Sequence, residues 1–564
     1  MTERISDALR EATAALGVHD ARFRLDRPRE TGHGDLATNV AMALASRLRR
    51  PPREIAQELK DRLGGIDGVE RIEIAGPGFL NFFLGAAAVG DAVHRILAAA
   101  DDYGRNDDGH GRCVMVEFVS ANPTGPLHLG HGRQAALGDA IARLLAWSGW
   151  RVHREFYFND AGGQILRLAG SVRARYQQLL GHDEPVPEDG YQGEYVLEIA
   201  AGLLDRFGRK YEHDHGEDAL EDMRQLAVRI LRAGQEEDLA AFNVHFDEYY
   251  PETRLYSEGR VKETIRALDG TGLTYRKDGA AWLRTSRFGD QKDRVMVKSD
   301  GSPTYFLPDV AYHMAKWERG FQHVINVQGS DHHSTVDRVR AGLRALDRPP
   351  GYPEYVLHQM VTVERGGQEV RFSKRAGSYT TLAELVEEVG ADVARYFFLM
   401  RRPEAHLAFD LDLALEQSDR NPVYKVQYAH ARLCRLFKLA GDRGWDTDPE
   451  AFADADTALL ADPVEREVVK QLADFPGFLR RAATARAPHL ICDYLEKTAG
   501  LVNSWYQSGH PTRNPALSTL VADPALRTAR MALAGAARTV LKNGLAVLGI
   551  HAPDRMVRDV AGSP

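Results

Sequence analysis

Residues 113–158 constrain the fold most, because strand, loop and helix signals follow one another there in a fixed order. An apolar run at 113–118 is typical of a buried strand, and 120–130 after it are rich in Gly and Pro. A helical pattern covers 131–147, and a second strand pattern covers 152–158. This order is typical of a parallel α/β sheet with right-handed crossovers.

Other segments extend this picture to a multidomain α/β protein. We expect further strands of the Rossmann-like parallel sheet at 324–327 and 355–363. Three domains are predicted: a small α+β N-terminal domain, a central Rossmann-like domain with a mostly helical insertion, and an all-α C-terminal bundle. Their ranges are 1–110, 111–415 with the insertion at about 160–294, and 416–564. The polar, Gly-rich segment 101–111 is the expected first linker.

Composition excludes several classes of protein. The chain has 564 residues, and Lys+Arg 72 against Asp+Glu 80 gives a net charge of −8, which argues against a general nucleic-acid coat but not against local basic faces. No apolar stretch approaches the roughly 20 residues of a membrane span, and the charged N-terminus lacks the apolar centre of a signal peptide. The distant Cys113, Cys434 and Cys492 exclude a disulfide framework and a Cys-rich zinc module. We therefore expect a cytoplasmic protein.

Two short motifs carry chemistry. His128-Leu-Gly130-His131 lies between the first strand and its helix, where a helix N-terminus, a glycine and two imidazoles suit phosphate binding. The basic loop 371–378 contains Ser373, Lys374 and Arg375, and a lysine on such a loop suits the charge of a departing pyrophosphate.

These motifs resemble the "HIGH" and "KMSKS" signatures of class I aminoacyl-tRNA synthetases. Longer strings at 117–126, 390–400 and 421–432 resemble the arginyl-tRNA synthetases, as do His33-Gly-Asp35 and residues 76–82. The sequence departs from that family at Phe372 and Arg371 in the lysine loop and at Lys425 in the C-terminal helix motif.

The resemblance implies activation of L-arginine by ATP with Mg²⁺, followed by transfer to the 3′ end of the arginine tRNA. The resemblance assigns four residues to the phosphates and the departing pyrophosphate: His128, His131, Lys374 and Arg375. It assigns six residues to ATP binding: Gly130, His131, Gly329, Asp331, Ser373 and Lys374. It assigns five residues to arginine binding: Glu117, Asn122, Tyr305, Asp309 and His332. Independently, Tyr305 and Asp309 at i and i+4 would point to one place on a helix that Pro308 suggests begins about there. A guanidinium needs carboxylates that accept its planar fork of donors.

Contacts with tRNA are expected on basic helices despite the acidic total. Two segments, 424–438 and 524–553, each carry several Lys and Arg and contain no Asp or Glu. The first of these segments offers Arg432, with Tyr428 nearby to stack on a base. The resemblance implies D-loop contacts at Phe79 and Asn81 and an anticodon contact at Met556. We expect a monomer without membrane contact, without a protein-bound metal and without tightly bound zinc.

Other functions remain open at this point. A class I synthetase for cysteine would need clustered Cys/His zinc ligands, and one for glutamate would repel its substrate from an acidic pocket. A non-catalytic tRNA-binding protein would not need His128, His131 and Lys374. A compact adenylyltransferase would not need the helical C-terminal domain.

Overall fold

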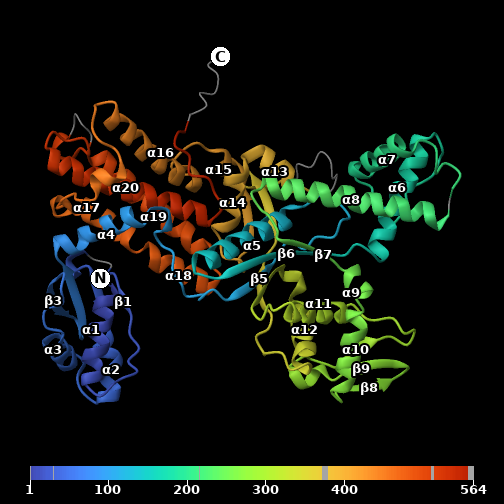
Figure 1. The fold of residues 1–564 in the computed structure, drawn as a ribbon, viewed down its shortest axis with the longest axis horizontal. Helices are drawn as coiled ribbons and strands as arrows, with labels where there is room; N and C mark the ends of the chain where they lie inside the picture. The colour runs from blue at the N-terminus through green and yellow to red at the C-terminus, as the bar shows by residue number, and fades with distance from the viewer. Residues whose placement is uncertain (1, 29–30, 215, 371–378, 510–513, 557–564) are drawn as a thin grey trace. The chain divides into compact units, whose positions relative to one another are not determined.

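The computed structural model describes residues 2–28, 31–214, 216–370, 379–509 and 514–556. The chain forms two compact units, 1–103 with 429–475 and 498–540, and 104–428 with 476–497 and 541–564 (Figure 1). Among the described residues, no helix is both long and apolar enough to cross a membrane.

The first unit contains a four-stranded antiparallel sheet in the order β1-β2-β4-β3. Its strands are β1 Leu25–Asp26, β2 Leu36–Thr38, β3 Val69–Ala75 and β4 Phe79–Leu84, and its N-terminal helices are α1 Thr2–Ala15, α2 Val40–Leu48, α3 Pro52–Leu63 and α4 Ala86–Ala99. The turn 75–78 joins β3 to β4, and a side chain at Gly78 would clash with the backbone of Pro52. This is the small α+β arrangement that the sequence predicts.

The second unit is built on a five-stranded parallel sheet in the order β12-β11-β5-β6-β7. Its strands are β5 Cys113–Glu117, β6 Arg151–Phe158, β7 Glu248–Pro251, β11 Val324–Gly329 and β12 Glu354–His358. The central β5 is apolar and fully buried at Val114, Met115 and Val116, as expected of a strand covered on both faces. The predicted Rossmann-like sheet is therefore present.

Two features of this sheet differ from the prediction. The expected strand at 355–363 is two strands, because β12 joins the parallel sheet while β13 Val361–Arg365 pairs with β14 Gln368–Glu369 and β15 Leu407–Asp410. The edge strand β7 has only four residues and lies within the range expected to be helical. Such a short strand carries too few residues to show an alternating pattern.

Helices surround the sheet and form a separate helical group in the insertion. Figure 1 shows α6, α7 and α8 packed together, and they share an apolar core around Leu168, Ile199 and Met223. The helices of this unit before residue 416 are α5 Leu129–Trp147, α6 Gly163–Leu179, α7 Glu194–Phe207, α8 Glu217–Ala241, α9 Thr253–Ser257, α10 Arg260–Gly270, α11 Phe306–Glu318, α12 His333–Ala345, α13 Leu382–Val389, α14 Ala391–Leu399 and α15 Leu411–Leu415. A small antiparallel sheet follows α10, with strands β8 Thr274–Lys277, β9 Ala280–Leu283 and β10 Arg294–Val297.

From 416 onward the described residues form helices and no strand, as expected of an all-α region. The helices are α16 Pro422–Gly441, α17 Pro463–Ala473, α18 Phe475–Ala485, α19 His489–Ser508 and α20 Pro524–Val547. Residues of these helices belong to both compact units. The three-domain division by sequence range stays a prediction.

Candidate active site

The two histidines of the first motif fix one another at the start of α5. His128 is the N-cap residue, and its Nδ1 accepts a hydrogen bond from the backbone N–H of His131 at 3.3 Å. The backbone N–H of His128 donates to Nδ1 of His131, also at 3.3 Å, and the rings stack with centroids 3.6 Å apart. Because each Nδ1 accepts, each neutral ring keeps its hydrogen on Nε2. The motif therefore offers two N–H donors at the positive end of a helix, which suits phosphate.

The protonation state and packing of this motif depend on its neighbours. Burial holds the pKa of His131 well below its usual value, and the nearby His128 and His358 lower it further, so the ring is neutral at pH 7. A Cβ at Gly130 would lie 2.9 Å from Cε1 of His128. Glycine is therefore needed here to let the His128 ring fold back over the helix start.

Several contacts hold the loop and the first turns of α5 in place. The guanidinium of the fully buried Arg133 donates to the carbonyls of Gln359, Arg402 and Ala405 at 2.8–3.0 Å. The backbone N–H of Leu382 donates to the carbonyl of Leu127 at 2.7 Å. These bonds tie the phosphate-binding motif to segments on both sides of the basic loop.

The predicted loop residues Ser373, Lys374 and Arg375 lie outside the described residues. Tyr379, the first described residue after the loop, donates its hydroxyl to the carbonyl of Pro126 at 3.2 Å. Its ring meets the ring of His128 edge-on, with centroids 6.0 Å apart. One end of the loop is therefore anchored next to the first motif.

The carboxyl ends of β5 and β11 bring the other predicted residues to the same edge of the sheet. Open α/β sheets bind ligands at this edge, where neighbouring strands continue in opposite directions. Gly329 ends β11, and the turn Ser330–His332 leads into α12. The Asp331 carboxylate is 82% exposed and lies 3.6 Å from Nε2 of His332. Both side chains are therefore accessible, but His332 contacts Asp331.

Glu117 and Asn122 already have protein partners. Glu117, buried at the end of β5, accepts hydrogen bonds from Lys316 Nζ at 2.5 Å and from Ser120 Oγ at 2.9 Å. Val119 and Ser120 between them adopt left-handed backbone with φ of 67° and 44°, a strained bend for a β-branched residue. Asn122 accepts from the backbone N–H of Asn159 at 3.1 Å and donates to Gln164 at 2.9 Å.

Asp309 lies in the first turn of α11 and is partly buried. Burial raises its pKa to about 7, with a further rise from the carboxylates of Glu117 and Glu252. Within the described part of the chain, no hydrogen bond or ion pair reaches the Asp309 carboxylate. Tyr305 is the N-cap of α11, which begins two residues before the expected Pro308, and its side chain is 92% exposed.

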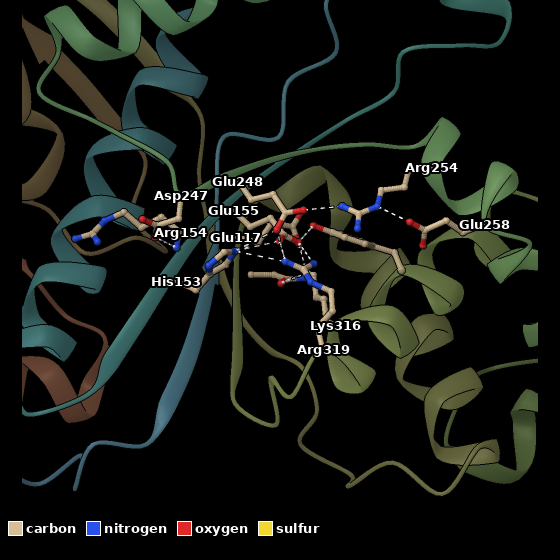
Figure 2. Close-up of polar contacts among 12 residues, drawn as sticks. Glu117, His153, Arg154, Glu155, Asp247, Glu248, Arg254, Glu258, Lys316 and Arg319 are labelled. Carbon is tan, nitrogen blue, oxygen red and sulfur yellow. Dashed lines mark hydrogen bonds and ion pairs between the residues drawn. The ribbon is translucent and has the colours of Figure 1, made fainter.

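A buried charge network lies behind these residues, and the sequence analysis missed it. Figure 2 shows Lys316 of α11 and Arg319, the residue after this helix, reaching carboxylates on neighbouring strands. Arg319 binds Glu155 at 2.5 Å and Glu248 at 2.6 Å. Burial raises the pKa of Glu155, but hydrogen bonds from His153 and Arg319 outweigh it and lower the pKa to about 2. His153, Glu155 and Glu248 lie close enough to hold a metal ion, but Arg319 already supplies the cation there.

Four carboxylates in this region differ in whether the protein neutralises them. Glu117 pairs with the fully buried Lys316 of α11, and Glu155 pairs with the partly buried Arg319 just after that helix. Glu252 accepts only the Tyr157 hydroxyl at 2.9 Å, burial raises its pKa, and no Lys or Arg of the described chain is within ion-pair distance of it. Among the same described residues, no Lys or Arg forms an ion pair with Asp309. The site therefore carries unmatched negative charge, which suits a cationic substrate.

The predicted tRNA-contacting residues differ in the exposure of their side chains and in the partners that these side chains have. In the first unit Phe79 is 39% exposed, but Asn81 is 4% exposed, so its side chain is not on the surface. Arg432 of α16 donates to Asn503 at 2.7 Å and lies 5.0 Å from the centroid of the Tyr506 ring.

In the second unit Tyr428 stacks on Tyr424 with centroids 5.8 Å apart, and Met556 is partly exposed. The expectation that basic residues of α20 face RNA is wrong for Arg530 in the first unit. This residue is buried and binds Glu465 at 2.6 Å, because the two lie at facing positions of α20 and α17.

Family models match three parts of the chain. The arginyl tRNA synthetase N terminal domain matches 1–84, the tRNA synthetases class I (R), catalytic domain matches 92–398, and the DALR anticodon binding domain matches 426–556. Together with the parallel sheet and the paired histidines, these matches define a class I aminoacyl-tRNA synthetase.

Whole-chain comparisons narrow the class. An arginine–tRNA ligase of Cupriavidus necator is 47% identical over 98% of this chain and 99% of its own, and one of Thiobacillus denitrificans is 50% identical over 95% of both. The structure of Thermus thermophilus arginyl-tRNA synthetase superposes with a TM-score of 0.76 at 25% identity, over 99% of this chain and 100% of that one. The chain belongs to the arginyl-tRNA synthetase family.

Proposed function

We propose that this enzyme activates L-arginine with ATP and transfers the arginyl group to the 3′ end of its tRNA. The observation that carries the proposal is the pairing of two sites at one sheet edge: phosphate donors at His128 and His131, and carboxylates without a cation at Asp309 and Glu252. A guanidinium keeps its charge at every working pH and is matched by such carboxylates.

In the first step the carboxylate of arginine attacks the α-phosphorus of ATP, and pyrophosphate leaves. Positioning and charge stabilisation are the main contributions of the protein to such a reaction. The Nε2–H groups of His128 and His131 hold phosphate oxygens, and Lys374 with Arg375 stabilises the departing pyrophosphate. Mg²⁺ enters on the ATP phosphates and neutralises part of their charge. Gly329 and Asp331 contact the ribose of ATP.

The arginine side chain lies with its guanidinium at Asp309 and the Tyr305 hydroxyl. Tyr305 is exposed without substrate, so it is free to move onto the guanidinium. Glu117, Asn122 and His332 surround the α-amino and carboxylate groups. For His332 this requires release from Asp331, a weak contact at 3.6 Å between exposed side chains.

In the second step a ribose hydroxyl of the tRNA 3′ end attacks the arginyl adenylate. The anticodon loop is contacted by Tyr428, Arg432 and Met556. The D-loop of the tRNA is contacted by Phe79. The Asn81 side chain is 4% exposed, so its contact with the D-loop requires this side chain to become accessible when tRNA binds.

ATP–pyrophosphate exchange in the presence of tRNA, measured separately with each of the twenty amino acids, tests the proposal. We expect exchange with arginine alone. Exchange with glutamate or cysteine, or binding of arginine and tRNA without any exchange, would contradict it. A chain with Asp309→Asn should lose the exchange, while the matched control Asp269→Asn, an exposed acid on α10, should keep it.

A further inference from the structure

We propose that Lys316 is a positioning residue of the arginine site, which holds the Glu117 carboxylate in place and supplies a buried positive charge that offsets the negative charge of Glu117. This inference rests on the proposed function and names a residue that acts through Glu117 rather than on the substrate itself. Its basis is the set of contacts around the Lys316 ammonium (Figure 2).

The Lys316 ammonium is fully buried and fixed from three sides. Its Nζ donates to Oε2 of Glu117 at 2.5 Å and to Oδ1 of Asn326 at 3.3 Å, and it lies 4.1 Å from the centroid of the Tyr312 ring. Because an unpaired polar group in the interior is costly, these partners fix the position of the Lys316 side chain.

The orientation of Asn326 shows that this arrangement is specific. The Asn326 amide N–H donates to Nε2 of His313 at 3.2 Å, which turns the amide oxygen toward Lys316. Burial holds the pKa of His313 well below its usual value, with Lys316 lowering it further, so the ring is neutral and can accept. The polar partners thus select an ammonium at this point.

Helix geometry places this cation on the same face of α11 as Asp309. Asp309, Tyr312 and Lys316 are at i, i+3 and i+7 of α11, so they lie along one face of the helix. Tyr312 donates its hydroxyl to Glu155 at 2.6 Å, which fixes the middle of this face against β6. The same helix therefore carries Asp309, which would face the guanidinium, and Lys316, which pairs with Glu117.

Charge balance gives Lys316 its functional effect. The charged groups that act on Asp309 are Glu117 of β5, Glu252 after β7, Lys316 of α11 and Arg338 of α12. The carboxylates of this group also raise the pKa of nearby tyrosines, which are Tyr157, Tyr256, Tyr312, Tyr352 and Tyr355. Without Lys316, the repulsion between the Glu117 and Asp309 carboxylates would no longer be offset, so Asp309 would keep its proton to a higher pH. The guanidinium would then lose part of its countercharge.

The test is calorimetric titration of arginine and of ATP into the full chain with tRNA, from pH 6 to 9. We expect Lys316→Met to weaken arginine binding tenfold or more at pH 7, to leave ATP affinity within twofold, and to shift the pH midpoint of arginine binding upward by about one unit. Lys316→Arg keeps the charge and should restore most of the affinity. The control Arg294→Met removes the cation of another partly buried pair, with Asp290, and should behave as the unaltered chain.

A double variant distinguishes a charge effect from a folding defect. Lys316→Met with Glu117→Gln removes both charges, so Asp309 has neither the extra repulsion nor the compensating cation. We expect weakened arginine binding with a pH midpoint close to that of the unaltered chain. An upward shift in the double variant too, an unshifted midpoint in Lys316→Met, or equal losses for arginine and ATP would overturn the proposal. An unaltered chain that does not bind arginine would instead refute the proposed function itself.

Discussion

The backbone N–H of His131 donates to Nδ1 of His128, and the backbone N–H of His128 donates to Nδ1 of His131. These two reciprocal hydrogen bonds give each ring two roles. Its Nδ1 caps the helix, and its Nε2–H remains free to bind a ligand. The motif is therefore both the structural start of α5 and a phosphate site.

Substitutions at His131 can separate these roles. His131→Asn keeps an acceptor near the Nδ1 position, so the cap should persist while the rate of adenylate formation falls on the order of 10²–10³-fold. His131→Gln keeps a donor near the Nε2 position, so the rate should fall less but the helix should lose about 1 kcal/mol of stability. Exchange kinetics and urea unfolding measure the two effects. Equal losses of rate in both variants would mean that Nε2–H does not contact phosphate.

Arginine binding should strengthen as pH rises through about 7, because the pKa of Asp309 is raised to about 7 and only the ionised carboxylate attracts the guanidinium. Affinity should be about tenfold lower at pH 6 than at pH 8, and binding near pH 7 should release about half a proton. Titration calorimetry in buffers of different ionisation enthalpy measures that release.

Asp309→Asn is the matched variant for this pH effect. It should weaken arginine binding by roughly 3–5 kcal/mol and abolish the proton release, with ATP affinity nearly unchanged. If the pH dependence survives in Asp309→Asn, another group controls it.

Asp139 of α5 and Arg395 of α14 form a buried pair with 2.6 Å between Oδ2 and Nη2, and Arg395 also donates to the carbonyls of Phe242 and Leu548. Arg395→Met would leave Asp139 in the interior with only its more exposed partners, Arg143 and Arg154. We expect a loss of about 3 kcal/mol or more in the free energy of unfolding. Arg143→Met, at a residue 29% exposed, should cost much less. Similar midpoints of urea unfolding for the two variants would contradict this reading.

Arg432→Ala should weaken tRNA binding and reduce its salt dependence by about one phosphate contact. Because Arg432 donates to Asn503, the control Asn503→Ala removes this partner and keeps the charge. Filter binding across a salt series measures both. Weaker binding with an unchanged slope would indicate a base contact, and no change in either quantity would place the anticodon site elsewhere.

The sequence predicts the parts of the site that depend on local pattern. His128 and His131 occupy the strand–loop–helix junction where the motif places them, because the fold of a short loop follows from its own residues. Asp309 lies on the expected helix for the same reason.

Features that depend on distant packing escaped prediction. In the sequence Lys316 looks like an ordinary helix lysine, and its burial depends on β5 and β11, some 200 and 10 residues away along the chain. The sequence around Arg530 is typical of a basic, RNA-facing helix, but in the fold Arg530 forms an ion pair with Glu465 of α17. Asn81 is 4% exposed although Phe79, two residues earlier in β4, is 39% exposed. Pairing across the fold, which no local pattern reports, decides the positions of Lys316 and Arg530.

The central claim is that carboxylates without an internal cation select arginine by its charge. Citrulline has almost the same shape as arginine but carries no charge, so exchange of ATP with pyrophosphate in the presence of tRNA should be compared for the two amino acids. We expect kcat/KM for citrulline to be lower by about 10²–10⁴-fold, the loss of one buried countercharge interaction. Exchange with citrulline within tenfold of that with arginine would contradict the account.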